Sequence, residues 1–413
     1  MRVPLCDLQR QIAALQPELM AAVARVLSSG RFILGPEVDA WEREVEGYLK
    51  VRHAVGVGSG TDALWLTLRA LGIGPGDAVL TTAYSFFATV SAIRLAGAEP
   101  VFADIEPGTF TLAPDGVRTI LEGRSAVHRR LGIRPRAIKA LLPVHLFGQP
   151  AEMASLFAVA REHRLFVVED AAQALGATYR EREAGTLGDA GCFSLFPTKN
   201  LGAFGDAGLV VTASDELAAR VRSLREHGSR QRYVHEAIGT NSRLDALQAA
   251  LLRVKLPHLE AWIAARQAHA AAYDAVLRDV PWLECPRRAP DRTHTFHQYT
   301  VRVRDRRRDG LQRFLGERGI ETAVYYPLPL HLQPALRDLG YTAGDFPHAE
   351  QASQQLLSLP MFPELTDDER FRVAAVIHEF PAEQLVVGRA PAREAGPPNG
   401  AGDGPGGGRA FFG

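Results

Sequence analysis

AVGVGSGTDALWLTLRAL, residues 54–71 of this 413-residue chain, joins an apolar run, a Gly/Ser/Thr turn and an amphipathic segment. This order predicts a buried strand, a tight turn and a helix. The first turn of a helix presents unpaired N–H groups and the positive end of the helix dipole, so it favours an anion. Gly58 and Gly60 let the backbone approach the anion closely, and Ser59 and Thr61 add hydroxyl donors. The stretch therefore predicts an anion site beside a strand end.

Short apolar runs alternate with helical segments on both sides of this stretch. The predicted strands cover residues 54–57, 78–81, 100–103, 138–144, 165–169 and 208–212. The predicted helices outside this alternation cover residues 10–30, 37–50, 244–278 (long Ala/Leu-rich segments), 309–318 and 366–379, with a further strand at 296–304. Strands that alternate with helices predict an α/β fold, in which a mostly parallel sheet is flanked by helices.

The length and texture of the chain predict two domains and a tail. A chain of 413 residues is more than one small core usually holds. We expect a large domain over residues 1–250, which includes the N-terminal helices, and a smaller C-terminal α+β domain over residues 251–387. Residues 388–413 are rich in Gly and Pro (GPPNGAGDGPGGG), which predicts disorder.

The composition argues against several classes of partner. Lys+Arg and Asp+Glu both number 47, so the net charge is zero, and neither nucleic acid nor an acidic membrane is an expected partner. No apolar run is long enough to span a bilayer, and the first residues lack the apolar core of a signal peptide, so we expect a cytoplasmic protein. The three cysteines are far apart, which argues against a disulfide framework or a zinc site.

An acidic pair ends the apolar run LFVVEDAAQ at residues 165–173. Glu169 and Asp170 fall at the C-terminal end of a predicted central strand, where open α/β sheets place ligands. Since side chains alternate along a strand, one carboxylate should point into the site and the other away. A carboxylate there could keep a pyridine nitrogen protonated, which makes pyridoxal phosphate (PLP) an electron sink. A metal ligand or a helix cap are the competing interpretations.

A lysine follows in CFSLFPTKNLG, residues 192–202. Lys199 comes after an apolar strand and before a glycine-rich turn, in what should be a loop. Burial beside a cofactor would lower its pKa, as a Schiff-base lysine needs, although most lysines are solvated surface charges. The turn at 58–63 also fits the loose dinucleotide pattern G-x-G-x-x-[GA], but no acidic residue ends the next strand to bind a ribose.

Nine segments in this order resemble the DegT/DnrJ/EryC1/StrS family of sugar aminotransferases. They are GRFILGPEV (30–38), GSGTDAL (58–64), GAEPVFADIEP (97–107), PVHLFGQPAEM (143–153), VVEDAAQALGA (167–177), FSLFPTKNLGAFGDAG (193–208), NSRLDALQAALLRVKL (241–256), YYPLPLHLQP (325–334) and LSLPMFPEL (357–365). The resemblance covers about residues 1–380. It implies the type I PLP-dependent aminotransferase fold and a homodimer whose active sites lie at the subunit interface.

The resemblance also assigns roles to matching residues. It implies that Lys199 carries the cofactor and is catalytic, and that Asp170 pairs with the pyridine nitrogen. Gln173 matches the side chain that meets the phenolic oxygen of the ring. Phe86 matches the aromatic residue that stacks on the ring, although a plain core phenylalanine is the alternative.

The phosphate of the cofactor should be bound by residues of both subunits. Gly60, Thr61 and Ser194 match phosphate contacts within one chain. Asn241 matches an asparagine that reaches the phosphate from the other subunit. The implied set therefore extends the anion site inferred from residues 54–71.

The implied reaction moves an amino group from L-glutamate to a nucleotide-linked keto-6-deoxyhexose, in deoxyamino-sugar biosynthesis. HLFGQPAEM, TKNLGAFGDAG and NSRLDALQAA resemble the members that aminate C3, and a dTDP carrier is favoured. Members acting at C4 more often carry a GEGG-like segment where this chain has residues 205–208 (GDAG). The alternatives are a C4 or other keto-sugar or keto-cyclitol aminotransferase, and a PLP-binding regulatory or scaffold protein without turnover.

Four further residues are candidate substrate contacts. Tyr325, Tyr326 and His331 lie in a segment that could line the sugar site or pack around its prolines. Arg243 could receive the carboxylate of the donor, or the nucleotide diphosphate, from the neighbouring subunit, or form a structural ion pair. Relatives that dehydrate C3 carry histidine at the position of Lys199, so the lysine favours amination.

Overall fold

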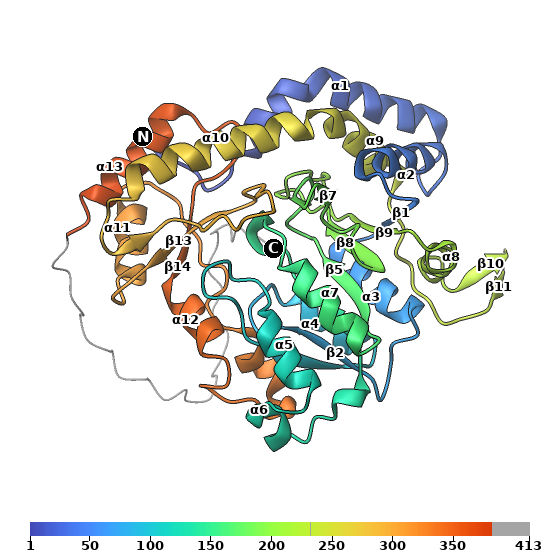
Figure 1. The fold of residues 1–413 in the computed structure, drawn as a ribbon. Helices are drawn as coiled ribbons and strands as arrows, with labels where there is room; N and C mark the ends of the chain where they lie inside the picture. Colours follow the sequence, from blue (N-terminus) through green and yellow to red (C-terminus); the bar gives the residue numbers. More distant parts are fainter. Residues whose placement is uncertain (232, 382–413) are drawn as a thin grey trace, which may run out of the picture.

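The structure is a computed structural model that describes residues 1–231 and 233–381. A seven-stranded sheet in the order β1-β9-β8-β5-β4-β2-β3 forms its centre (Figure 1). The strands are β1 (His53–Val57), β2 (Ala78–Thr82), β3 (Glu99–Ala103), β4 (Ile138–Leu142), β5 (Phe166–Asp170), β8 (Ala190–Ser194) and β9 (Gly208–Thr212). Only β9 runs antiparallel to its neighbours in this sheet, and the other pairs are parallel. The predicted mostly parallel α/β sheet is confirmed.

Helices cover both faces of this sheet. One face carries α3 (Gly60–Ala70), α4 (Ala88–Leu95) and α8 (Asp215–Leu224), and the other carries α2 (Pro36–Leu49), α5 (Pro114–Leu121), α7 (Met153–Glu162) and α9 (Ala246–Lys255). Alternation along the strands creates the two layers: Val210 of β9 packs in the core of α3 and α8, whereas Leu209 and Val211 pack with α2 and α9. A short helix, α6 (Ala126–Arg130), lies at the edge of the domain.

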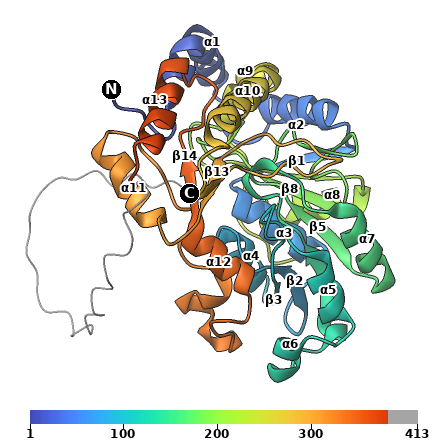
Figure 2. The same ribbon diagram turned by 60° about the vertical axis from the view of Figure 1, so that its left-hand side comes forward.

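The first long helix, α1 (Leu8–Ser29), lies across the outside of this domain. The side chain of Asp7 caps its start, and Gly30 ends it in the left-handed region at φ 63°. Its Ala22 and Val26 pack against α9. Figure 2 shows α1 beside α13 and α9, so the N-terminal segment contacts elements from the far end of the chain.

The C-terminal part has its own core. It contains α10 (Leu259–Leu277), β12 (Leu283–Glu284), β13 (Tyr299–Val303), α11 (Arg308–Glu317), α12 (Pro347–Gln355), β14 (Leu356–Leu359) and α13 (Asp367–His378), and the three strands form an antiparallel sheet. Val3 joins this core from the other end of the chain. β13 starts later than predicted because Phe296 has φ 46°, which no strand residue adopts.

Short elements complete the described residues. They are the hairpins β6 (Thr178–Tyr179)–β7 (Arg182–Glu183) and β10 (Ser229–Gln231)–β11 (Val234–His235), and the 3₁₀ turns Pro135–Ala137, Leu146–Gly148, Leu256–His258, Leu330–Leu332 and Pro334–Leu339. The β10–β11 hairpin projects from the edge of the molecule beyond α8 (Figure 1). The tail predicted to be disordered lies outside the described residues, and the two predicted domain ranges stay predictions.

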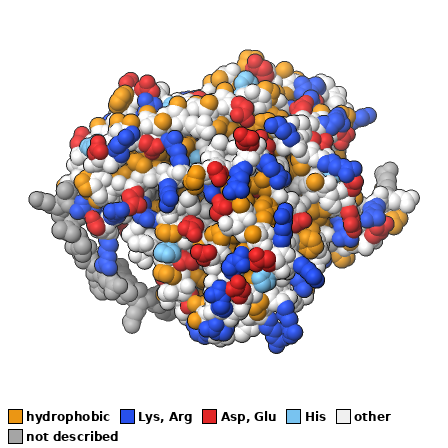
Figure 3. Space-filling view, in the orientation of Figure 1, with side chains coloured by type: hydrophobic (Ala, Val, Ile, Leu, Met, Phe, Trp, Pro, Cys, Tyr) orange, Lys and Arg blue, Asp and Glu red, His pale blue; other side chains and the backbone are white. Residues whose placement is uncertain are grey.

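The surface mixes both signs of charge. Figure 3 shows acidic and basic side chains interspersed over the face in view, as expected from equal numbers of each. Among residues 1–231 and 233–381, no helix has both the length and the apolar character needed to cross a membrane.

Candidate active site

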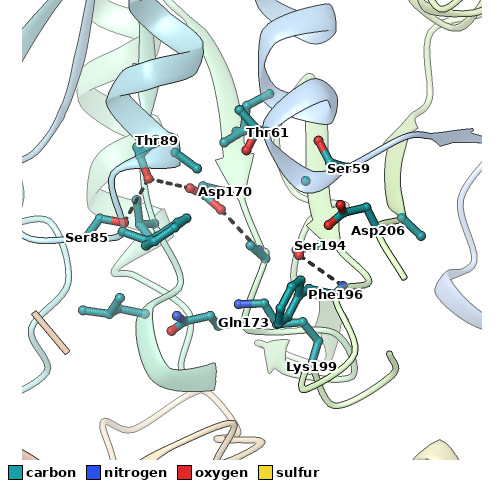
Figure 4. A pocket seen from close by; sticks show the side chains of 18 residues that line it. Ser59, Thr61, Ser85, Thr89, Asp170, Gln173, Ser194, Phe196, Lys199 and Asp206 are labelled. Carbon is teal, nitrogen blue, oxygen red and sulfur yellow. Dashed lines mark hydrogen bonds between the residues drawn. The ribbon is translucent and has the colours of Figure 1, made fainter. Parts of the chain in front are cut away.

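A cavity of about 240 Å³ opens at the C-terminal ends of the parallel strands (Figure 4). β5 contributes Asp170 and β8 contributes Ser194 at their last residues, and α3 contributes its first turn. The lining includes seven residues predicted to bind the cofactor: Gly60, Thr61, Phe86, Asp170, Gln173, Ser194 and Lys199. The fold thus brings together residues spread over 140 positions of the sequence, from Gly60 to Lys199.

The anion end of the cavity is formed by the start of α3. Ser59 caps the helix, because its hydroxyl accepts a hydrogen bond from the N–H of Asp62 at 3.1 Å. A Cβ at Gly60 would lie 2.7 Å from the Cβ of Ser194, so glycine is needed where the turn meets β8. The helix start, the hydroxyls of Thr61 and Ser194 and this close approach fit a bound phosphate.

Asp170 carries the carboxylate of the site. It is buried, at 4% exposure, and its Oδ2 accepts a hydrogen bond from Thr89 Oγ1 at 2.8 Å while Oδ1 accepts one from the N–H of Ala172 at 3.3 Å. Burial raises the pKa of Asp170, and the hydrogen bond from Thr89 is the largest of the effects that lower it.

Glu169 points away from the cavity, as alternation along the strand predicts. Its carboxylate lies 2.8 Å from His145 Nε2 and accepts hydrogen bonds from three backbone N–H groups of the following loop, those of Gly185, Leu187 and Gly188. Since His145 Nδ1 accepts from the N–H of Ala151 at 3.1 Å, the proton of the ring is on Nε2 and is donated to Glu169. This acid fixes the loop under the site.

Lys199 lies in the turn after β8, half-buried, with its amine directed into the cavity (Figure 4). Burial lowers the pKa of Lys199 to about 8, against the opposing effect of the charge on Asp170. A lysine with this lowered pKa is neutral more often near neutral pH than an ordinary lysine, which makes it a better nucleophile and base.

Gln173 connects the cavity to the segment that follows α11. Its Oε1 accepts from the N–H of Phe147 at 2.6 Å and its Nε2 donates to Tyr326 Oη at 3.2 Å, so both ends of the amide are oriented. Tyr326 also lies near Phe86, with the ring centroids 5.9 Å apart. Phe86, at 42% exposure, lines the cavity rather than filling a core.

Tyr325 and Tyr326 line a second, smaller cavity of about 40 Å³, which shares Lys199 and Gln173 with the first. His331 is buried elsewhere: its Nε2 lies 3.0 Å from Glu350 Oε1, and it lines neither cavity. Its local contacts are structural, so its role toward substrate stays a prediction without support from this geometry.

Asn241 and Arg243 also lie outside both cavities. Asn241 is exposed and Arg243 is half-buried, on the segment that leads from the β10–β11 hairpin to α9. The family resemblance places both residues at the partner's site, and their position outside this chain's own cavities is compatible with that. Both assignments stay predictions.

Two groups of site residues were not foreseen from the sequence. Ser85 and Thr89 line the cavity beside Asp170, and His145 with Glu169 supports the loop beneath it. The spacing of Ser85 and Thr89, four positions apart around the start of a helix, was a usable signal, because such residues lie on one helix face. His145 lies in the loop after β4, 24 residues before Glu169 on β5, so their pairing leaves no local pattern.

The site as a whole fits PLP. A helix start for the phosphate, a buried carboxylate for the ring nitrogen and a lysine of lowered pKa for the aldehyde surround one cavity. A type I fold with these three groups defines the class of PLP-dependent aminotransferases.

Comparison with known proteins agrees with this class. The model of the DegT/DnrJ/EryC1/StrS aminotransferase family matches residues 13–378. A dTDP-3-amino-3,4,6-trideoxy-alpha-D-glucose transaminase of Streptomyces venezuelae is 46% identical over 92% of this chain and 96% of its own length. A pleiotropic regulatory protein of Geobacillus stearothermophilus is 47% identical over 92% of this chain and 99% of its own length.

A solved structure gives the same result. The crystal structure of S. venezuelae DesV in complex with a ketimine intermediate has a TM-score of 0.87 and 45% identity, and the match covers 93% of this chain and all of that one. The chain belongs to the DegT/DnrJ/EryC1/StrS aminotransferase family. The predicted family, fold and PLP cofactor are confirmed.

Proposed function

We propose that this aminotransferase moves an amino group from L-glutamate to C3 of a dTDP-linked keto-6-deoxyhexose. The cavity that joins Lys199, Asp170 and the helix start of α3 carries the aminotransferase part of this proposal. The S. venezuelae relative, whose printed name is that of a 3-amino-sugar transaminase on a dTDP carrier, supports the position and the carrier. We place the enzyme in the cytoplasm.

Bound PLP supplies an electron sink for the charge that develops when the α-proton of the amino donor is removed. Lys199 would hold the cofactor and, once freed, its amine would move a proton between the donor's α-carbon and the cofactor. Asp170 would keep the ring nitrogen protonated, and Gln173 would orient the phenolic oxygen. The side chain of Phe86, which lines the cavity, would cover the ring and exclude water. Amination of the sugar reverses these proton transfers, so ping-pong kinetics are expected.

A second copy of the chain completes the proposed site. Asn241 and Arg243 lie outside the two cavities. Several large apolar side chains are exposed, among them Phe86 in the cavity lining and Val234 on the projecting hairpin, together with Phe32, Ile33, Phe204 and Ile238. Exposed apolar groups of this kind are typical of an interface between subunits. Asn241 of each subunit would then reach the phosphate bound by the other.

A screen of nucleotide-linked sugars tests the proposal. The purified holoenzyme is incubated with L-glutamate and with dTDP-linked 3-keto and 4-keto sugars, and NMR identifies the aminated carbon. Amination at C3 supports the proposal, and activity confined to 4-keto sugars contradicts it. Sedimentation measures the oligomeric state, and a monomer with full activity would contradict the shared site.

A regulatory protein without turnover is a second candidate, favoured by the name of the Geobacillus stearothermophilus relative. It predicts a yellow protein that binds PLP but shows no spectral change with any amino donor. The enzyme predicts that L-glutamate converts the cofactor to its amine form, which absorbs at shorter wavelength. A single absorbance titration therefore separates the two functions.

A further inference from the structure

Two buried hydroxyl groups form a chain that ends on the carboxylate of Asp170 (Figure 4). Thr89 Oγ1 donates to Asp170 Oδ2 at 2.8 Å and lies 2.9 Å from Ser85 Oγ. Ser85 is 4% exposed and Thr89 1%. Because Thr89 uses its one proton on the carboxylate, Ser85 is the donor of the bond between the two hydroxyls.

The local fold fixes this chain in place. Ser85 lies in the turn after β2 and Thr89 in the first turn of α4, so the two side chains fall on one side of the helix start. The same segment carries Phe86, which lines the cavity. One turn of backbone thus provides a wall of the cofactor cavity and the partner of its carboxylate.

The chain acts on a carboxylate whose ionised form burial disfavours. Burial is the largest effect on the pKa of Asp170 and raises it, whereas the hydrogen bond from Thr89 opposes this. A hydroxyl that donates to a carboxylate stabilises its ionised form and, with the N–H of Ala172 on the other oxygen, orients its plane. Only the ionised form can keep a pyridine nitrogen protonated.

We propose that Ser85 and Thr89 form a relay of positioning residues that holds Asp170 ionised and aimed at the ring nitrogen of the cofactor. This rests on the proposed role of Asp170. The relay acts through the carboxylate of Asp170. It therefore controls how strongly the bound cofactor withdraws electrons.

Three substitutions separate this role from simple packing. Thr89→Val removes the hydroxyl and keeps the shape of the side chain, whereas Thr89→Ser keeps the hydroxyl. Thr67→Val is the matched control, because Thr67 is equally buried on α3 and its hydroxyl lies 3.4 Å from Cys192 Sγ, outside the cavity lining.

The readouts are the affinity of the cofactor-free protein for PLP, by fluorescence titration, and the pH midpoint of the visible absorbance of the holoenzyme. Thr89→Val should weaken PLP binding roughly tenfold, as loss of a hydrogen bond to a charged group allows. It should also raise the pH midpoint, because a neutral ring nitrogen withdraws less electron density from the nitrogen that Lys199 shares with the cofactor. Ser85→Ala should move both values in the same direction by less.

Thr89→Ser and Thr67→Val should both stay within about twofold of the wild-type affinity. Wild-type affinity and midpoint in Thr89→Val would overturn the relay, as would an equal change in Thr67→Val. Asp170→Asn distinguishes this failure from failure of its basis. If Asp170→Asn moves both values and Thr89→Val moves neither, the relay is wrong and the role of Asp170 stands; if Asp170→Asn moves neither, both are wrong.

Discussion

Two lysines, the half-buried Lys199 and the buried Lys255, have the same lowered pKa, about 8, and quite different surroundings. Lys255, at 2% exposure, donates to the carbonyl of Gly202 and lies 5.0 Å from the ring centre of Phe204 and 5.8 Å from that of Trp262. It is closed in by its own partners. In both lysines the pKa is lowered mainly because burial penalises the charged amine.

Lys199 differs because its amine opens on two cavities and faces a carboxylate, Asp170. A perturbed pKa alone therefore does not identify a functional lysine. A functional lysine also needs access to a cavity and a partner group of the right chemistry. Lys255 supports the turn that follows Lys199, since its acceptor Gly202 lies in that turn.

The largest expected effect separates the two lysines by activity. Lys199→Ala should lower the rate of transamination by about 10³-fold or more, because it removes both the attachment of the cofactor and the proton carrier. Lys255→Met should retain at least about a tenth of the rate, since it removes only a support. Steady-state kinetics with L-glutamate and a keto-sugar measure both, and equal losses would break the distinction.

The carboxylates of Asp170 and Glu169 also contrast a group of the active site with a group that supports the fold, and the expected effect is smaller. Asp170→Asn should lower kcat/KM by about 10²-fold, because the ring nitrogen loses its anionic partner. Glu169→Gln should instead lower the free energy of unfolding by about 2–3 kcal/mol, because an amide cannot accept all four hydrogen bonds that Glu169 receives. Thermal unfolding of both holoenzymes is the companion measurement. A stable, inactive Glu169→Gln protein would contradict this division.

Stability as a function of pH tests Lys255 directly. The folded protein releases the Lys255 proton near pH 8, whereas the unfolded chain holds it to about pH 10.5. Unfolding therefore takes up a proton between these values, and the contribution of this group to the free energy of unfolding rises with pH, by at most about 3 kcal/mol. In Lys255→Met this contribution should be absent, so the free energy of unfolding should not show this rise with pH.

The measurement is the difference in free energy of unfolding between the wild type and Lys255→Met at pH 7.5 and at pH 9.5. The wild type should gain on the variant as pH increases. A difference independent of pH would mean that the rings of Phe204 and Trp262 hold the amine charged through a cation–π interaction, against the effect of burial.

The smallest expected effect concerns a tyrosine that, like Lys255, is closed in by partners. Tyr84 Oη donates to the carbonyl of Tyr325 at 2.6 Å and accepts from the N–H of Tyr326 at 2.7 Å, so it ties the segment after α11 to the turn after β2. Tyr84→Phe should lower the free energy of unfolding by about 1 kcal/mol. It should change KM for the sugar more than kcat, and a drop in kcat alone would argue against this tie.

The sequence predicted most of the sheet because its strands are short, continuous apolar runs, such as 208–212, which β9 matches at both ends. It also predicted that Glu169 and Asp170 point to opposite sides, which follows from the period of a strand. Which of the two faces the cavity needed the family resemblance. The support of Glu169 by His145 needed the structure, because that contact joins a residue in the loop after β4 to a residue on β5, 24 positions later.

The candidate substrate residues were less predictable for a physical reason. Tyr325, Tyr326 and His331 share one short segment, yet the backbone turns within it, and His331 enters the core against Phe346, with ring centroids 4.8 Å apart. Sequence proximity does not fix direction in a segment without regular structure. The same holds for Asn241 and Arg243, whose proposed site lies on another subunit.

The connection between β8 and β9 has a consequence for the reaction. Ser194 and Gly208 pair across the two strands, so the loop that carries Lys199 is pinned at both ends on the sheet. In the proposed reaction, an amine displaced by the donor would stay tethered within the reach of one side chain. Its effective concentration at the cofactor would then be set by a few torsion angles and not by diffusion, which would favour rapid proton transfer and recapture of the cofactor after every turnover.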